Sequence, residues 1–219
     1  MNLAIFDLDH TLINCDSSSE WSNFLHEKGI FSDADMQRHQ AFDQDYRKGC
    51  LDLDAYLAFV LRPLAKYSRA ELDEMHREFM QRIRPSITQM ARMLVDSDRD
   101  AGDTLLMISA TNEFIITPIA REFGIENIIG ISLETDAQGN YTGHPIGTPS
   151  FQEGKVTRLH QWLAERGQSQ ADYEKVYFYS DSRNDLPLLE QVNQPVAVNP
   201  DPVLTLTAAQ RGWPILDFV

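Results

Sequence analysis

The chain has 219 residues, and its 33 acidic residues outnumber its 19 Lys and Arg residues, so its formal net charge at pH 7 is −14. Such a length predicts one domain with an insertion or two small domains. The acidic balance argues against a nucleic-acid partner, because such proteins usually present a basic face. Any phosphate chemistry would have to depend on a bound cation and a few local positive groups.

The first strand ends in two carboxylates. Residues 3–6 are apolar, and Asp7 and Asp9 follow at alternate positions, so their side chains leave an extended strand on the same side. Like charges held together repel, and burial adds to the cost. The pair is therefore either a solvated strand end with turn-forming residues or a nucleophile and a general acid/base beside a cation.

The pattern from about residue 15 to 84 is helical throughout. Ser17 with Glu20 predicts a capping box for a first helix, and Ser68 with Glu71 predicts another for the last helix of this block. Two more amphipathic helices are expected over residues 32–48 and 52–61. We therefore expect an inserted all-helical cap over residues 15–84, with a core made of residues 1–14 and 85–219.

Strand and helix patterns alternate along the rest of the chain. Short apolar runs at 105–108, 127–131, 176–179, 195–198 and 213–216 predict strands, and residues 133–143 predict a small hairpin. Ser150 with Glu153 is expected to cap the helix that runs to Gly167. Strands that alternate with helices indicate an α/β fold with a Rossmann-like, doubly wound parallel sheet.

The chemically suggestive residues follow predicted strands. Ligands of such sheets bind at the carboxyl ends of the strands, where Asp7, Asp9, Ser109, Asp181 and Asp185 all lie. Lys155, in the first turns of a helix, could face the same crevice. These oxygen ligands suit Mg²⁺, and they include no zinc-type cluster of His and Cys. In such a site Asp9 would tend to keep a proton, as a general acid must.

Four segments carry a family resemblance: Asp7-Leu8-Asp9-His10-Thr11, then Ser109, then Lys155, then Asp181-Ser182-Arg183-Asn184-Asp185. In this order and context they resemble the four motifs of the haloacid dehalogenase superfamily of phosphatases. The helical block lies where that family places a helical cap. The chain is most similar to the phosphoserine-phosphatase-like branch. Within that branch it resembles bacterial histidinol-phosphate phosphatases, including at Asp16, Trp21 and Gly212-Trp213-Pro214.

The resemblance implies a Mg²⁺-dependent phosphomonoester hydrolase acting on a small molecule. In this family Asp7 would attack phosphorus to form an aspartyl-phosphate, and Asp9 would protonate the leaving group and then activate water. The remaining roles implied are metal ligation by Asp7, the Asp9 carbonyl and Asp181, positioning of those ligands by Asn184 and Asp185, support of the first loop by Thr11, and phosphate binding by Ser109, Ala110, Thr111 and Lys155.

The substrate is expected to be histidinol phosphate. Asp16 stands where related phosphatases bind a substrate amine, and Phe42 and Tyr46, four apart on one helix, could flank an imidazole. Trp21 is either part of the cap interior or a further substrate contact. A carboxylate clamp, which phosphoserine would need, has only Arg47 and Arg62 as candidates. Phosphoserine and other small amino-alcohol phosphates remain the alternative.

Other classes of protein fit less well. A phospho-accepting signalling domain is usually shorter and lacks a helical insertion, and a silent binding protein would not need the whole motif set. A cysteine-dependent phosphatase built on Cys15 would need an Arg where Trp21 stands. We expect a cytoplasmic monomer or homodimer without a membrane partner, because no apolar run approaches membrane-spanning length and no secretory signal precedes Leu3. The cap is expected to move through residues 14–17 and 82–86.

Overall fold

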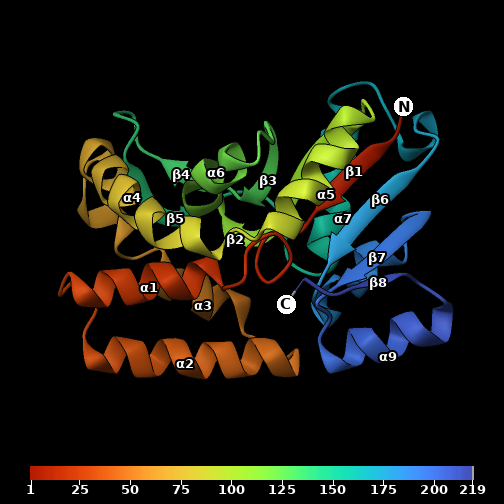
Figure 1. Ribbon diagram of the computed structural model, residues 1–219. Helices are drawn as coiled ribbons and strands as arrows, with labels where there is room; N and C mark the ends of the chain where they lie inside the picture. Colours follow the sequence, from red (N-terminus) through yellow and green to blue (C-terminus); the bar gives the residue numbers. More distant parts are fainter. Residues whose placement is uncertain (219) are drawn as a thin grey trace.

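A six-stranded parallel sheet forms the centre of the computed structural model, which describes residues 1–218 (Figure 1). Its strand order is β3-β2-β1-β6-β7-β8, so β1 lies inside the sheet between β2 and β6. The strands are β1 (Leu3–Phe6), β2 (Thr104–Asn112), β3 (Asn127–Ile131), β6 (Val176–Ser180), β7 (Gln194–Val198) and β8 (Ile215–Leu216). A separate hairpin consists of β4 (Leu133–Thr135) and β5 (Tyr141–Pro145). The predicted fold class is confirmed.

Helices cover both faces of the sheet. Side chains alternate along a strand, so Ala4 and Phe6 pack with α5 (Gln89–Asp100) and α6 (Glu113–Glu122) on one face. Leu3 and Ile5 point to the other face, which is covered by α7 (Glu153–Ala164), α8 (Leu186–Leu189) and α9 (Pro202–Arg211). Both faces of β1 are therefore buried, which explains why its residues form an unbroken apolar run.

Four α-helices lie between β1 and α5. They are α1 (Ser17–Glu27), α2 (Asp33–Lys48), α3 (Leu53–Val60) and α4 (Arg69–Ile83). None of the helices within residues 1–218 is long and apolar enough to cross a membrane. The division into a cap and a core stays a prediction, because buried residues of α1 and α4 belong to the same hydrophobic cluster as residues of the sheet.

An aromatic cluster joins α1 and α4 to α6. The Trp21 ring centroid lies 5.1 Å from that of Phe79 and 5.4 Å from that of Phe114. His76 lies 5.1 Å from Phe114, and its Nε2 donates a hydrogen bond of 2.9 Å to the Ile115 carbonyl. In contrast, α2 has His39 as its one buried residue. Helix α3 buries Leu57, Phe59 and Val60, so α2 is the least buried of the four inserted helices.

Two of the predicted helix caps are wrong. The cap of α1 is Asp16 rather than Ser17, and its Oδ1 accepts the Ser19 N–H at 2.6 Å. Helix α7 follows Gln152, which has a positive φ of 50° and no capping hydrogen bond, while the Ser150 hydroxyl donates to the Ser109 carbonyl at 2.6 Å. Ser150 therefore braces the loop after β2. The capping box of Ser68 and Glu71 is confirmed.

The burial of His76 makes stability depend on pH. Burial lowers its pKa from the ordinary value of 6.5. The unfolded chain binds a proton here near pH 6.5, whereas the folded chain binds it only at lower pH. The free energy of unfolding should therefore fall as the pH drops below about 6.5. We expect His76→Gln, which does not titrate but can still donate to Ile115, to lose less stability than the parent on acidification. Urea denaturation at several pH values measures this, and parallel curves for the two proteins would contradict it.

Candidate active site

A small chamber lies at the carboxyl ends of β1, β2 and β6, covered by α2 and α3. Its volume is about 60 Å³, and a larger cavity of about 480 Å³ adjoins it on the outer side. The two share His10, Asp16, Asp43, Tyr46 and Asp181. The other residues around the inner chamber are Asp7, Asp9, Ser18, Phe42, Leu51, Leu53, Tyr56, Ser109, Ala110, Thr111 and Phe151. Strand ends and inserted helices thus enclose one space.

Lys155 joins two buried carboxylates beneath this chamber. Its Nζ lies 2.7 Å from Asp7 Oδ1 and 2.7 Å from Asp185 Oδ2, and all three side chains are buried. The Ser180 hydroxyl donates to Asp185 at 2.6 Å. Burial alone would lower the pKa of Lys155, but attraction to Asp185 and Asp7 overcomes it and raises the pKa. The lysine therefore stays charged.

Asp7 and Asp9 have different surroundings. Burial raises the pKa of Asp7 to about 6 although Lys155 opposes the shift. The pKa of Asp9 rises to about 8 because of burial and repulsion from Asp16 and Asp7. Asp9 Oδ1 accepts the Ser17 N–H at 2.7 Å, and its Oδ2 accepts the Thr111 hydroxyl at 3.0 Å. Asp9 thus keeps a proton more readily than Asp7 does.

The oxygen atoms around Asp181 suit a hard divalent cation. Burial and repulsion from Asp7 and Asp185 raise the pKa of Asp181 well above its ordinary range. Among residues 1–218, Lys155 is the one cation in an ion pair with Asp7 or Asp185, so negative charge is left uncompensated. Residues 1–218 hold no group of three His, Cys, Asp or Glu side chains arranged for a metal. The implied set needs only two carboxylates, because its third ligand is the Asp9 carbonyl.

The loop after β2 provides polar groups on the other side of Asp7. Ser109 is buried, and its Oγ accepts the Thr111 N–H at 3.0 Å. Ala110 and Thr111 line the chamber beside it. The Thr111 hydroxyl, expected near phosphate, also fixes Asp9. Thr11 is buried with its hydroxyl 3.5 Å from Asp7 Oδ2, as a support of the first loop would be.

The loop after β6 connects the site to α2. The Asn184 side chain accepts from Gln152 at 3.2 Å and donates to the Tyr46 carbonyl at 3.3 Å. The Tyr46 ring lies 5.9 Å from Phe151. Asn184, expected to position metal ligands, therefore also holds the end of α2 over the chamber.

The chamber contains an acidic residue that the sequence analysis missed. Asp43 lies beside Asp16, accepts from the Ser19 hydroxyl at 3.3 Å and approaches His39 Nδ1 at 3.5 Å. Burial raises the pKa of Asp43, and Asp16 adds to this effect. Its position one residue after Phe42 and three before Tyr46 was a usable signal. It was hidden because α2 also carries Asp33, Asp35 and Asp45 on other faces.

Other candidate substrate contacts lie elsewhere. Trp21 belongs to the aromatic cluster of α1, α4 and α6 and does not line either cavity. The Arg62 guanidinium pairs with Asp35 at 2.8 Å. Arg47 and Arg183 line the outer cavity but not the inner chamber. The inner chamber therefore has no Lys or Arg among its lining residues.

Comparisons with known proteins agree with this geometry. The family model described as haloacid dehalogenase-like hydrolase matches residues 4–190. A protein named histidinol-phosphatase from Neisseria meningitidis is 58% identical over 219 residues, which covers 99% of each chain. A Bordetella pertussis protein described as of unknown function has a solved structure with a TM-score of 0.93 and 44% identity, covering 100% of this chain and 99% of that one.

A more distant structure extends the likeness in fold. A substrate-bound phosphoserine phosphatase has a TM-score of 0.71 and 18% identity, and the match covers 98% of this chain and 92% of that one. At this identity the likeness concerns the fold alone. The family model, in contrast, spans the ends of β1, β2 and β6 and the start of α7, where the carboxylates and Lys155 meet. The chain belongs to the haloacid dehalogenase-like hydrolases and is a phosphomonoesterase.

Proposed function

We propose that this phosphomonoesterase hydrolyses histidinol phosphate with the help of Mg²⁺. The observation that carries the proposal is the 58% identity to a histidinol-phosphatase over 99% of both chains. The charge of the chamber supports it independently. Asp16 and Asp43 line the inner chamber, which has no Lys or Arg in its lining, and this suits a substrate with an ammonium group, although both residues also border the outer cavity that Arg47 lines. Histidinol phosphate has such a group and no carboxylate, whereas phosphoserine has both.

The residues suit attack by a carboxylate on phosphorus. Asp7 would form the bond to phosphorus, and the leaving alkoxide would take a proton from Asp9, which then accepts a proton from the water that cleaves the aspartyl-phosphate. Ser109 and Lys155 would hold phosphate oxygens. Bound Mg²⁺, held by Asp7, the Asp9 carbonyl and Asp181, would neutralise phosphate charge. Asn184 and Asp185 would hold the metal ligands in position.

Hydrogen bonds already present would keep Asp9 in position for both proton transfers. The Ser17 N–H and the Thr111 hydroxyl each hold one of its oxygens, at 2.7 and 3.0 Å. Holding the acid in one orientation is a large part of what such a reaction needs, since in-line phosphoryl transfer depends mainly on positioning and charge.

Substrate entry requires part of the cover to move. The inner chamber, of about 60 Å³, is much smaller than the outer cavity of about 480 Å³ that adjoins it, and too narrow for histidinol phosphate as it stands. Helices α1 and α4 are fixed to α6 by Trp21, Phe79 and Phe114, whereas α2 buries one residue. We propose that α2 moves while α1 and α4 stay, a narrower movement than that of the whole cap.

This movement is testable by hydrogen exchange. Amides of α2 should exchange faster than those of α4, because opening breaks few buried contacts of α2. Adding orthovanadate, a phosphate analogue, with Mg²⁺ should slow exchange in α2 and leave α4 unchanged. Equal exchange in α2 and α4 that responds equally to vanadate would instead indicate movement of all four helices together.

The substrate itself is tested by phosphate release from histidinol phosphate and L-phosphoserine under identical conditions, with Mg²⁺ and with EDTA. We expect kcat/KM to favour histidinol phosphate by at least about tenfold, because phosphoserine would bring a carboxylate beside Asp16 and Asp43. EDTA should abolish turnover. Asp7→Asn should also abolish it, since an amide does not form the phosphoenzyme. A preference for phosphoserine would reject the proposed substrate and keep the reaction class.

The acidic pair gives a sharper test of substrate recognition. Asp16→Asn should retain the cap of α1, because Asn is also a good N-cap, but it removes a charge. Asp16→Asn and Asp43→Asn should each lower kcat/KM for histidinol phosphate by about tenfold, as a lost bond to a charged group would. Asp43→Asn should leave 4-nitrophenyl phosphate, which has no ammonium group, nearly unaffected, and Asp16→Asn should change its turnover only through the pKa of Asp9.

Asp45→Asn provides the matched control on the same helix. Asp45 pairs with Lys48 at 3.6 Å and does not line either cavity, so this variant should behave as the parent on both substrates. Equal losses on both substrates in the Asp16 and Asp43 variants would assign these residues to the reaction or to folding rather than to the ammonium group.

A further inference from the structure

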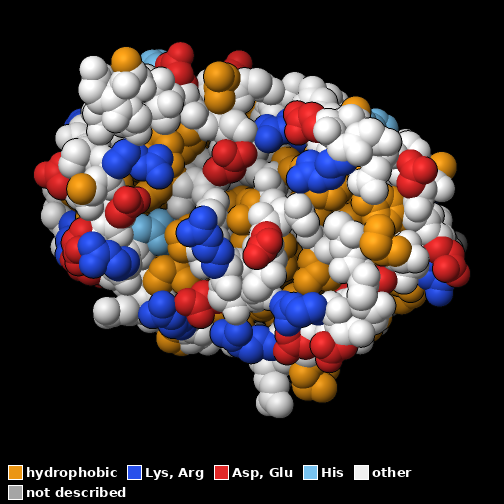
Figure 2. All heavy atoms as spheres, turned by 90° about the horizontal axis from the view of Figure 1, so that it is seen from above, with side chains coloured by type: hydrophobic (Ala, Val, Ile, Leu, Met, Phe, Trp, Pro, Cys, Tyr) orange, Lys and Arg blue, Asp and Glu red, His pale blue; other side chains and the backbone are white. Residues whose placement is uncertain are grey.

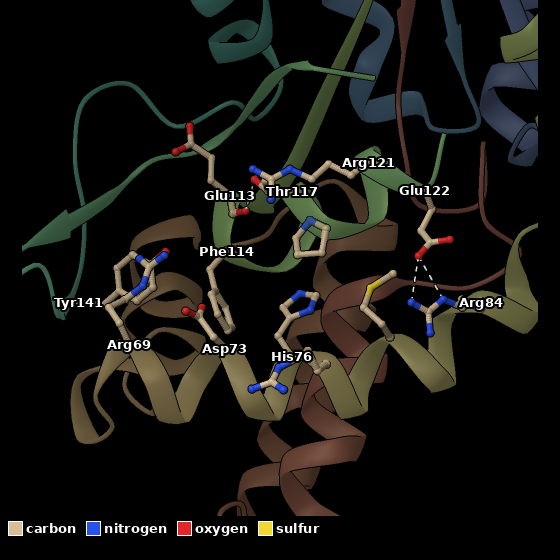
Figure 3. A pocket seen from close by; sticks show the side chains of 13 residues that line it. Arg69, Asp73, His76, Arg84, Glu113, Phe114, Thr117, Arg121, Glu122 and Tyr141 are labelled. Atoms are coloured by element: carbon tan, nitrogen blue, oxygen red, sulfur yellow. Dashed lines mark hydrogen bonds and ion pairs between the residues drawn. The ribbon is translucent and has the colours of Figure 1, made fainter. Parts of the chain in front are cut away.

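A large cavity lies apart from the active site. It has a volume of about 730 Å³ and lies between α4 and α6, with Tyr141 of β5 at one end (Figure 3). It shares no lining residue with the inner chamber or the outer cavity. None of the residues assigned to phosphate or metal binding contributes to it, so the hydrolysis of phosphate esters does not explain it.

The floor of this cavity is mostly apolar. Phe114 and His76 are buried and meet edge to face at 5.1 Å, and Met80 and Pro118 lie beside them. Pro118 lies inside α6 and has no N–H to give to the Phe114 carbonyl, the position that an unbroken helix would pair. Of these residues Pro118 is the most exposed, so it provides the apolar surface of the floor above the buried rings.

Four arginines surround this floor, and two of them are already neutralised. Arg84 pairs with Glu122 at 3.0 Å, and Arg77 pairs with Glu74. Figure 2, which looks down on the face with α4 and α6, shows basic and acidic side chains interspersed around patches of apolar surface. Glu113 does not neutralise the other two arginines, Arg69 and Arg121. Its carboxylate accepts from Ser132 at 2.8 Å and lies 3.6 Å from Arg158, and Figure 3 shows it turned away from Phe114.

The remaining charges on the cavity are those of Arg69, Arg121 and Asp73. Within residues 1–218, neither Arg69 nor Arg121 forms an ion pair with a carboxylate, and the Arg69 guanidinium lies 4.2 Å from the centre of the Tyr141 ring. Two positive groups and one negative group leave one positive charge, in a chain whose net charge is −14. Such a balance suits a ligand with a single negative charge better than a phosphate dianion.

We propose that this cavity is a second binding site, for a small molecule with one carboxylate attached to a flat apolar group. Arg121 and Arg69 would hold the carboxylate, and the ring would lie on Pro118. The ligand would contact both α4 and α6. The proposal does not depend on the identity of the phosphate ester that the enzyme hydrolyses.

A fluorescent probe of this chemistry tests the proposal on the intact enzyme. 1-Anilinonaphthalene-8-sulfonate carries one negative charge and flat rings, and its fluorescence rises in apolar surroundings. We expect saturable binding of one probe per chain, and displacement by phenylacetate. Arg121→Gln and Arg69→Gln should each weaken binding by about tenfold, as the loss of a charged hydrogen bond does.

Matched variants separate this site from others. Arg166→Gln removes an equal charge from the opposite face of the sheet, where Arg166 stacks on Trp162, and should bind the probe as the parent does. Asp7→Asn and added orthovanadate should also leave binding unchanged. Binding that is absent, that vanadate displaces, or that survives both cavity substitutions would overturn the proposal. Failure of phenylacetate to displace the probe would overturn the carboxylate assignment.

Discussion

The contact on which the site depends is the buried ammonium group of Lys155 between Asp7 and Asp185. Each partner comes from a different element: the end of β1, the first turns of α7 and the loop after β6. Removing one member would leave a buried charge without compensation, which in proteins typically costs about 3–5 kcal/mol. The same contact fixes where the strand ends meet, so folding and the positioning of the reactive carboxylate depend on one interaction.

The overall charge of the chain and the charge of a phosphate ester have the same sign. At −14 the molecule as a whole repels a phosphate ester, and attraction must come from groups within a few ångströms. In the reaction proposed above, Lys155 would supply part of that attraction from beneath the chamber, whose lining also includes Asp16 and Asp43. A substrate with a negative and a positive end would then meet complementary charges. Selectivity would thus arise from how charge is ordered around the chamber rather than from its total.

Much of the fold and of the candidate site could be predicted from sequence, because buried parallel strands leave unbroken apolar runs and their polar ends must share one edge of the sheet. Asp7, Asp9, Ser109, Lys155 and Asp181 come together for this reason. The cap of α7 was wrong because Ser150 satisfies a distant carbonyl, that of Ser109, instead of its own helix. Asp43 was missed because helical spacing alone does not tell which face of a polar helix meets a cavity. The cavity between α4 and α6 could not be predicted, since its residues come from two segments with no common motif.

The aromatic cluster divides the inserted helices in a way that matters for recombination between related proteins. Trp21 and Phe79 share their packing with Phe114 of the core, so replacing the whole insertion would mismatch three rings at once. A graft limited to α2 and α3 would leave these rings untouched and still exchange Phe42, Asp43, Tyr46 and Tyr56, which line the chamber. Substrate preference could therefore be changed by exchanging only the segment between the turn before α2 and the turn after α3, and not the whole insertion.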